Sequence, residues 1–195
     1  TIPLDDSIEE TSEYNGRRYQ RYSLENNTYF APIDEGEIAR LEVANRVFQQ
    51  SFDNRLIFPP VTSPDHVLDL GCGGGDWAIE VAEQFPDAEL SKVLGIDISP
   101  HMLPEYPPAN LELQVDDLNS RFTFRSDQFD IVHSQMVSGG IHADRWTSYI
   151  RDIFRVLRPG GWCQMVEIYF NAQSDNGMLT RGEWGSLRAA KRGFC

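Results

Sequence analysis

Residues 69–76 read DLGCGGGD and follow the apolar-leaning stretch HVL, so four glycines fall within five residues between a strand and a helix. Glycine at 71, 73, 74 and 75 supplies positive φ angles and leaves the backbone bare. The first turn of the following helix presents free N–H groups and a partial positive charge. Because a simple turn needs fewer glycines, the loop predicts a site for a polar or anionic group of a nucleotide-like ligand.

Strand and helix signals alternate on both sides of this loop. Alternation of this kind predicts an α/β fold with a doubly wound, Rossmann-like parallel sheet. A proline-rich stretch at 99–110 permits at most a short or broken helix. On the helix expected over residues 143–157, the residues spaced for an inward face are Trp146, Ile150, Ile153, Phe154 and Leu157. The expected strands cover 66–71, 90–99, 111–116, 129–135 and 162–170, the helices cover 76–85, with Asp76 as N-cap, and 143–157, and RPGG (158–161) forms a turn.

The region before the sheet predicts an N-terminal extension. Residues 1–30 are polar without a sustained period, so we expect mostly coil. Residues 33–52 predict a helix of about five turns, since Asp34 and Glu37 have capping-box spacing. Its apolar residues Ile38, Leu41, Ala44, Val47 and Phe48 fall near one face. The predicted units are therefore residues 1–60 (extension and cap helix), 61–175 (Rossmann-like domain) and 176–195 (a basic tail).

Composition excludes several classes of binding partner. The formal net charge is -13, which argues against a broad nucleic-acid-binding face. No run of about 18 apolar residues is present, so no membrane span is expected. Three irregularly spaced cysteines and the lack of an apolar leader segment favour a reducing compartment, the cytoplasm with the nucleus as the alternative. No Cys/His spacing indicates a metal site.

The identity of the ligand depends on acidic residues at the predicted strand ends. Gly73, Gly75 and Ala78 satisfy the dinucleotide pattern G-x-G-x-x-A, and the absence of a following Lys-Ser/Thr excludes a P-loop. Asp97 can accept hydrogen bonds from two ribose hydroxyls, which suits both NAD and an adenosine-based cofactor. Asp116 and Asp117 add acidic groups at the same edge, a field that favours a sulfonium cation over a diphosphate.

Five segments in this order and spacing resemble the class I S-adenosylmethionine-dependent methyltransferases. The upstream segment YFAPIDEGEIARLEVANRVFQQSF and the spacing of MVSGGI to the following tryptophan resemble more narrowly the fungal LaeA-like methyltransferases of secondary metabolism. The resemblance covers roughly residues 20–178. The five segments are VLDLGCGGGDWAIEVA, VLGIDIS, LELQVDDLN, FDIVHSQMVSGGI and VLRPGGWCQMVEI.

This resemblance implies roles for particular residues. Gly71, Gly73 and Gly75 would approach the methionine part of S-adenosylmethionine, with S-adenosylhomocysteine as the product. Asp69 would reach the amino group and Asp97 the ribose diol, while Asp117 would contact the adenine amine and Leu118 would offer its backbone N–H. The Arg158–Gly161 turn would be structural. Family members have seven strands, whereas only 25 residues follow Phe170, so we expect the last two strands to be missing.

Methyl transfer itself needs alignment and exclusion of water, and a base only for some acceptors. His133 and His142, at and after the fourth expected strand, are the candidate catalytic residues, and each can equally be a hydrogen-bonded structural histidine. Tyr29 and Tyr22 could face the sulfonium or serve in packing. We expect Trp77 to pack between the helix and the sheet. Cys72 has no evident base partner, so we do not expect a reactive thiol.

The leading interpretation is methyl transfer to a small molecule in secondary metabolism. Two alternatives remain open: a regulatory or scaffold protein that binds the cofactor without turnover, and a non-methylating enzyme such as a dehydrogenase or cyclase. We expect no nucleic-acid or membrane partner. A homodimer or a protein partner could cover the exposed edge of the fifth strand.

Overall fold

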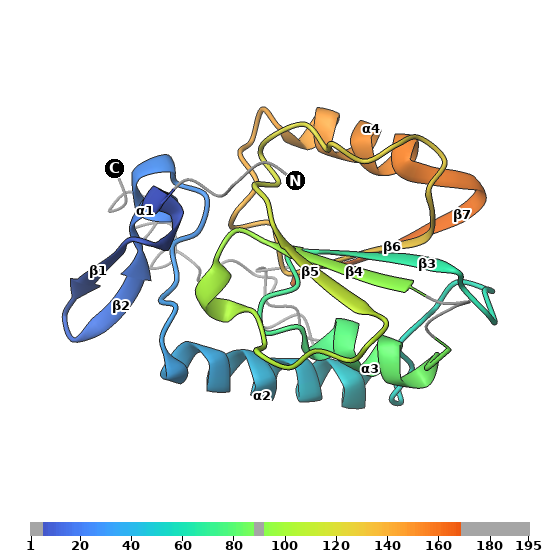
Figure 1. Cartoon of the computed structure of the whole chain (residues 1–195), viewed down its shortest axis with the longest axis horizontal. Helices are drawn as coiled ribbons and strands as arrows, with labels where there is room; N and C mark the ends of the chain where they lie inside the picture. Colours follow the sequence, from blue (N-terminus) through green and yellow to red (C-terminus); the bar gives the residue numbers. More distant parts are fainter. Residues whose placement is uncertain (1–5, 88–91, 169–195) are drawn as a thin grey trace, which may run out of the picture.

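A five-stranded parallel sheet forms the centre of the computed structural model, which describes residues 6–87 and 92–168. The strand order is β5-β4-β3-β6-β7 (Figure 1). The expected Rossmann-like parallel sheet is therefore confirmed, and the expectation that two further strands are missing falls on residues 169–195, outside the described residues. The strands are β3 (His66–Leu70), β4 (Lys92–Asp97), β5 (Leu111–Val115), β6 (Phe129–Gln135) and β7 (Leu157–Val166).

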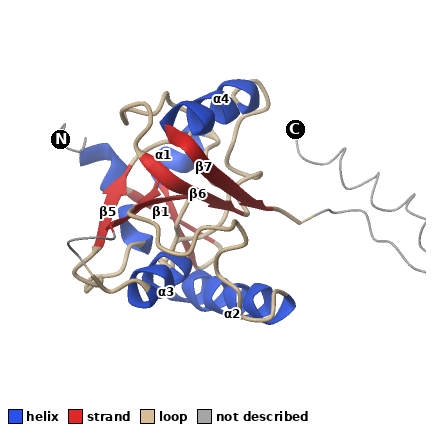
Figure 2. Cartoon of the chain, turned by 90° about the vertical axis from the view of Figure 1, so that its right-hand side faces the viewer, coloured by secondary structure: helices blue, strands red, loops and turns tan. Residues whose placement is uncertain are grey.

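Helices cover both faces of this sheet. Figures 1 and 2 show α4 (Trp146–Val156) on one face, and α2 (Glu35–Ser51) and α3 (Asp76–Gln84) on the other. Each face has its own buried apolar cluster, one around Leu68, Val132 and Tyr149 under α4, the other around Val67 and Ala78 under α3. In the part of the chain that the structure describes, no helix has the length and apolar character needed to cross a membrane.

The order of the strands determines where a ligand can bind. From β3 the chain moves outward to β4 and β5, and it then returns to place β6 on the other side of β3. The connections therefore diverge between β3 and β6, and ligands of open α/β sheets bind at the carboxyl ends of strands at such a point. Side chains alternate between the faces, so Asp69 shares the α3 face with Val67, while Leu68 and Leu70 pack under α4.

The expectation of coil over the first 30 residues is wrong for the part that the structure describes. The chain forms a short helix η1 (Asp6–Glu9), a hairpin of β1 (Thr11–Tyr14) and β2 (Arg17–Gln20), and helix α1 (Arg21–Asn26). Asn15 and Gly16, both with positive φ (50° and 71°), make the turn of this hairpin. Asn-Gly is the strongest short hairpin signal, and it was present in the sequence.

Two helix starts can be compared with their predictions. Asp34 caps α2 as expected, since its carboxylate accepts from the Glu37 amide at 3.1 Å. The N-cap of α3 is Gly75 instead of Asp76, because a residue with φ of 79° directly precedes the helix.

The face that α2 turns toward the sheet is less apolar than its sequence suggests. Val47 is 56% exposed, whereas Glu37 and Asn45 are buried. The helix therefore turns a partly polar face toward the sheet.

The inward face of α4 also differs from the face that the spacing of its apolar residues predicts. Ile150 and Phe154 are 44% and 81% exposed, so their predicted burial is wrong. Polar contacts set the rotation of the helix: Asp152 pairs with the buried Arg145 at 2.7 Å, and the Tyr149 hydroxyl meets Ser134 at 2.9 Å. A purely apolar count cannot register those contacts.

The segment RPGG does not form a separate turn before the last strand. Strand β7 already begins at Leu157 and includes these residues, with a register irregularity opposite Phe129 and Ile131. Gly160 absorbs the irregularity with a φ of 85°. The predicted strand end at Phe170 and the predicted basic tail at 176–195 lie outside the described residues.

Candidate functional site at the carboxyl edge of the sheet

The glycine loop joins β3 to α3 in a conformation that requires glycine. Gly71, Gly73 and Gly75 have φ angles of 73°, 55° and 79°. A Cβ atom on Gly71 would lie 2.7 Å from a methyl group of Val137, whereas one on Gly73 would have open space up to Leu41 at 3.8 Å. The loop is thus packed on one side and bare on the other, as a ligand cradle requires.

Asp97, at the end of β4, faces this loop. Its carboxylate accepts from the backbone amides of Gly73 and Ser99, both at 2.9 Å. Burial raises its pKa, although the two amide hydrogen bonds act in the opposite direction. Since a carboxylate has about four acceptor positions, the group remains able to accept from further donors such as ribose hydroxyls.

Asp69 and His133 form a buried pair between β3 and β6. Their side chains are 4% and 1% exposed, and Asp69 Oδ1 lies 2.8 Å from His133 Nδ1. The indole of Trp77 stacks on the imidazole at 3.7 Å between ring centroids and 14° between planes. Trp77 is therefore a packing residue, as predicted. Nε2 of His133 is buried and has no hydrogen-bond partner among the described residues.

The acidic pair after β5 is ordered by its own turn. Asp117 Oδ1 accepts from the Asn119 amide at 2.8 Å, and Asp116 Oδ1 accepts from the Asp117 amide at 2.9 Å. The Tyr22 hydroxyl donates to Asp117 Oδ2 at 3.4 Å. Burial, followed by the charge of Asp117, raises the pKa of Tyr22. Leu118 offers its carbonyl to Arg145 at 3.0 Å.

The segment of residues 20–30 crosses the same edge, and besides the contact of Tyr22 with Asp117 after β5 it contacts the chain after β4 and after β6. The buried Gln20 donates to the carbonyl of Ile98 at 3.0 Å, after β4. Thr28 packs so closely on the loop after β6 that a Cβ on Gly140 would lie 2.6 Å from its carbonyl oxygen. Tyr29 reaches Glu37 of α2 at 3.4 Å, and burial, then the charge of Glu37, raises its pKa.

His142 differs from the other candidate base. It is exposed, and its Nε2 lies 3.1 Å from the carbonyl oxygen of Asn26. Its backbone amide donates to Asn119. These contacts connect segment 20–30 to the loop after β6, and His142 does not line the cavity at the glycine loop. The structure thus separates two histidines that the sequence treated alike.

A cavity of about 150 Å³ lies between α2 and the glycine loop. Both Asp69 and His133 line it, opposite Arg40, Leu41 and Phe48 of α2. The cysteine in the loop, Cys72, also lines the cavity, and burial, then the charge of Asp97, raises its pKa, so it is not a reactive thiolate.

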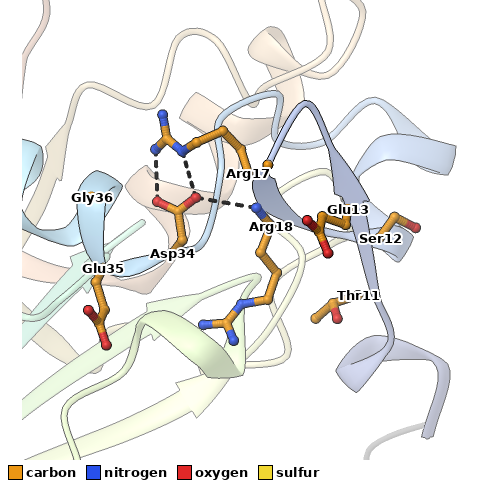
Figure 3. Close-up of a pocket in the computed structure, with 9 residues that line it drawn as sticks. Thr11, Ser12, Glu13, Arg17, Arg18, Asp34, Glu35 and Gly36 are labelled. Carbon is orange, nitrogen blue, oxygen red and sulfur yellow. Dashed lines mark hydrogen bonds and ion pairs between the residues drawn. The ribbon is translucent and has the colours of Figure 1, made fainter.

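A larger hollow than this cavity lies elsewhere in the described residues. It measures about 680 Å³ and is an open groove between the β1–β2 hairpin and the start of α2 (Figure 3). Arg17 of the hairpin donates to Asp34, the N-cap of α2, at 2.6 and 2.8 Å, and both residues line the groove. This ion pair holds the hairpin against α2. The groove contains none of the residues expected to bind a cofactor.

Comparison with known proteins agrees with this geometry. Residues 67–161 match the family described as "Methyltransferase domain". A SAM-dependent methyltransferase from Aquifex aeolicus superposes with a TM-score of 0.54 at 15% identity, covering 73% of this chain and 76% of that one. Haemonchus contortus phosphoethanolamine N-methyltransferase 1, solved with phosphoethanolamine and S-adenosylhomocysteine, gives 0.50 at 16% identity, covering 65% and 27%. The fold is that of the class I methyltransferases.

In sequence, the chain is similar to the LaeA proteins. It is 37% identical over 169 residues to Protein-methionine methyltransferase laeA of Emericella nidulans, covering 86% of this chain and 43% of the relative. It is 32% identical over 177 residues to Methyltransferase pytC of Aspergillus terreus, covering 90% and 52%. The chain therefore spans about half the length of the curated relatives that it matches.

Proposed function

We propose that this chain binds S-adenosylmethionine and transfers its methyl group to a small-molecule acceptor in secondary metabolism. The observation that carries the proposal is Asp97, which the bare side of the glycine loop holds through the Gly73 amide at 2.9 Å. A carboxylate fixed by backbone amides beside an open cradle matches a ribose diol with its adjoining aminoacyl chain.

The residues at the carboxyl edge fit the cofactor in both shape and charge. Gly73 leaves the loop open, and the aspartates at the ends of β3, β4 and β5 create a negative field around the place of a sulfonium cation. When bound, the cofactor supplies an electrophilic methyl group. The contribution of the chain is to align the acceptor and exclude water, and such positioning can be worth about 7–11 kcal/mol.

Each expected contact has a place in this proposal. Asp97 holds the ribose hydroxyls, Asp117 accepts from the adenine amine and Leu118 donates its amide. Gly71 and Asp69 lie beside the aminoacyl end. Tyr29 lies near Asp97 and closes the site from segment 20–30.

A second candidate acceptor is a methionine side chain of a protein. The laeA relative of Emericella nidulans is named a protein-methionine methyltransferase, which favours this acceptor. Other relatives are named secondary metabolism regulators, which keeps a regulatory role for this chain in view. Both acceptors use the same cofactor site, so the cofactor can be tested first.

Isothermal calorimetry with S-adenosylmethionine, S-adenosylhomocysteine and NAD tests the cofactor. We expect both sulfur compounds to bind and NAD not to bind. Asp97→Ala should weaken S-adenosylhomocysteine at least tenfold, while Asp65→Ala, at the opposite edge of the sheet, should leave the affinity unchanged. Binding of NAD without S-adenosylhomocysteine would contradict the proposal, and an unchanged affinity in Asp97→Ala would remove the ribose assignment.

A further inference from the structure

The buried pair of Asp69 and His133 leaves one nitrogen without a partner at the point where the sheet connections diverge. Asp69 takes Nδ1 at 2.8 Å, so the other ring nitrogen, Nε2, is the free one. It is buried and makes no hydrogen bond among the described residues. Buried polar atoms without a partner are rare and call for an explanation, and a ligand group is one.

The surroundings indicate which nitrogen carries the proton. Asp69, as a carboxylate, accepts a hydrogen bond, so it favours the neutral tautomer in which Nδ1 holds the hydrogen and Nε2 keeps its lone pair. Trp77 stacks on the ring and fixes its plane. A carboxylate at one nitrogen and a bare lone pair at the other is the arrangement of a general base with its orienting group.

Apart from Asp69, which hydrogen-bonds to His133, the expected cofactor contacts lie away from this histidine. They run from the glycine loop toward Asp97 on β4 and Asp117 on β5, on one side of β3. His133 is on β6, on the other side of β3, and lines the cavity together with Gln135 and the α2 residue Phe48. A methyl acceptor that enters between α2 and β6 therefore meets His133 before it meets the nucleoside region.

Resting on the proposed function, we infer that His133 is the base that removes a proton from the methyl acceptor, with Asp69 as its positioning residue. The acceptor is then a hydroxyl compound, such as a phenol or enol, or an N–H compound. A thioether has no proton to lose, so this pair would have no role in methylating a methionine side chain. The inference thereby chooses between the two acceptor classes left open above.

The step balances without a further reactant. The acceptor oxygen forms a bond to the methyl carbon as the carbon–sulfur bond breaks, and that electron pair stays on sulfur, which becomes neutral. The acceptor proton passes to His133 Nε2, and the resulting imidazolium lies against the Asp69 carboxylate until water removes the proton. The other titratable groups lining the cavity are Arg40 of α2, Cys72 of the loop and Asp76 of α3.

Two variants separate the nitrogens. His133→Asn keeps an amide group near the place of Nδ1 and removes Nε2, whereas His133→Gln puts an amide near the place of Nε2 that cannot act as a base. In calorimetry both should bind S-adenosylhomocysteine within threefold of the parent chain. A tenfold loss in both would make His133 a cofactor ligand and overturn the inference.

The protonation state can be measured without any acceptor. Long-range ¹H–¹⁵N NMR of the ¹⁵N-labelled chain at pH 7.5, assigned by the loss of signals in His133→Asn, should show hydrogen on Nδ1 and none on Nε2. Hydrogen on Nε2 would overturn the inference whether or not a substrate is found. A parent chain that fails to bind S-adenosylhomocysteine would contradict the proposed function instead.

Turnover then tests the acceptor class. With labelled S-adenosylmethionine, phenols and N–H compounds are compared with thioethers of the same carbon skeleton. Any transfer should go to the proton-bearing acceptors and fall about 100-fold or more in both variants, as loss of a general base predicts. Transfer to thioethers at a rate that both variants retain would overturn the inference, and if none of the probes reacts, the NMR result decides.

Discussion

Each edge of the sheet has an aspartate that accepts hydrogen bonds from two backbone amides, but among the described residues only one of the two aspartates also forms an ion pair. At the carboxyl edge, Asp97 accepts from the amides of Gly73 and Ser99. At the amino edge, Asp130 accepts from those of Asp65 and His66, both at 2.8 Å. Asp130 also forms an ion pair with Arg158, whereas Asp97 has no ion pair among the described residues.

This difference indicates what each edge does. At the amino edge the protein satisfies its own charge, which ties the start of β3 to β6 and β7. At the carboxyl edge it fixes an aspartate and leaves the negative charge uncompensated, which is costly unless a ligand completes it. The Arg-Pro-Gly-Gly segment thus stabilises the sheet at the edge opposite the site.

The largest expected effect on folding comes from Asp130→Ala. The variant loses two hydrogen bonds to a charged acceptor, each worth about 1.5–3 kcal/mol, so the free energy of unfolding should fall by about 3–6 kcal/mol. Asp97→Ala should lower it by less, about 1 kcal/mol, because removing an uncompensated charge recovers part of the loss. Urea denaturation measures both.

For the affinity for S-adenosylhomocysteine, the order of the two variants should be reversed, with Asp97→Ala more strongly affected than Asp130→Ala. The folded fraction of Asp130→Ala should bind within threefold of the parent, while Asp97→Ala loses tenfold or more. Equal losses of stability in the two variants would break the comparison between the edges.

A second expected effect uses two glycines, one at each edge. Gly71 and Gly160 both have positive φ, which costs an L-residue about 1–2 kcal/mol. A Cβ on Gly71 also meets Val137 at 2.7 Å, while one on Gly160 has nothing within 4 Å. Gly71→Ala should therefore destabilise by about 2–4 kcal/mol, and Gly160→Ala by about 1–2 kcal/mol. Thermal unfolding of the two variants checks the difference, and Gly71→Ala alone should reduce cofactor affinity.

The sheet, the glycine loop and most element positions were predictable because their signals are local. Alternating apolar stretches, a capping aspartate and a run of glycines each act within a few residues. The hairpin was also predictable from Asn15-Gly16, and its omission was an error of interpretation. The orientation of α4 was not, since it depends on the contact between Arg145 and Asp152 and on a hydroxyl pair with β6.

Sequence reasoning found the members of the candidate site but not their pairing. It assigned Asp69 to a cofactor amine and treated His133 as one of two equal histidines. Their contact at 2.8 Å depends on β6 lying beside β3, with Asp69 opposite His133 in register. The sequence places these residues 64 positions apart. Only the strand order reveals that they meet.

A smaller effect is expected from two neighbouring glycines of the carboxyl edge, Gly139 and Gly140. A Cβ on Gly140 would lie 2.6 Å from the Thr28 carbonyl oxygen, and one on Gly139 would lie 2.7 Å from the ring of Phe30. Phe30 is 73% exposed and can rotate, whereas the backbone of Thr28 cannot move without segment 20–30. Gly140→Ala should cost about 1–2 kcal/mol, and Gly139→Ala less than about 0.5 kcal/mol.

Hydrogen exchange distinguishes this from a general loss of stability. In Gly140→Ala the amides of residues 20–30 should exchange faster, while those of β3 and β6 remain protected. Uniform acceleration across the sheet would mean that segment 20–30 is not held specifically at the carboxyl edge.

The smallest effect concerns the pH dependence that Asp97 contributes. Burial raises its folded-state pKa above the ordinary 3.8, although the Ser99 and Gly73 amides lower it. The folded state therefore binds this proton more tightly than the unfolded chain does. Its contribution to stability is full below pH 3.8 and is lost as the pH rises through the folded-state pKa.

Asp97→Asn removes this proton, so the stability of the variant relative to the parent should rise across that window and then level off. Urea denaturation at intervals from pH 4 to 8 measures the difference, with Asp144→Asn as the control for loss of an exposed carboxylate. Parallel curves for parent and variant would show that the carboxyl edge does not hold an uncompensated charge. In that case the two edges would not differ in the way that their hydrogen bonds indicate.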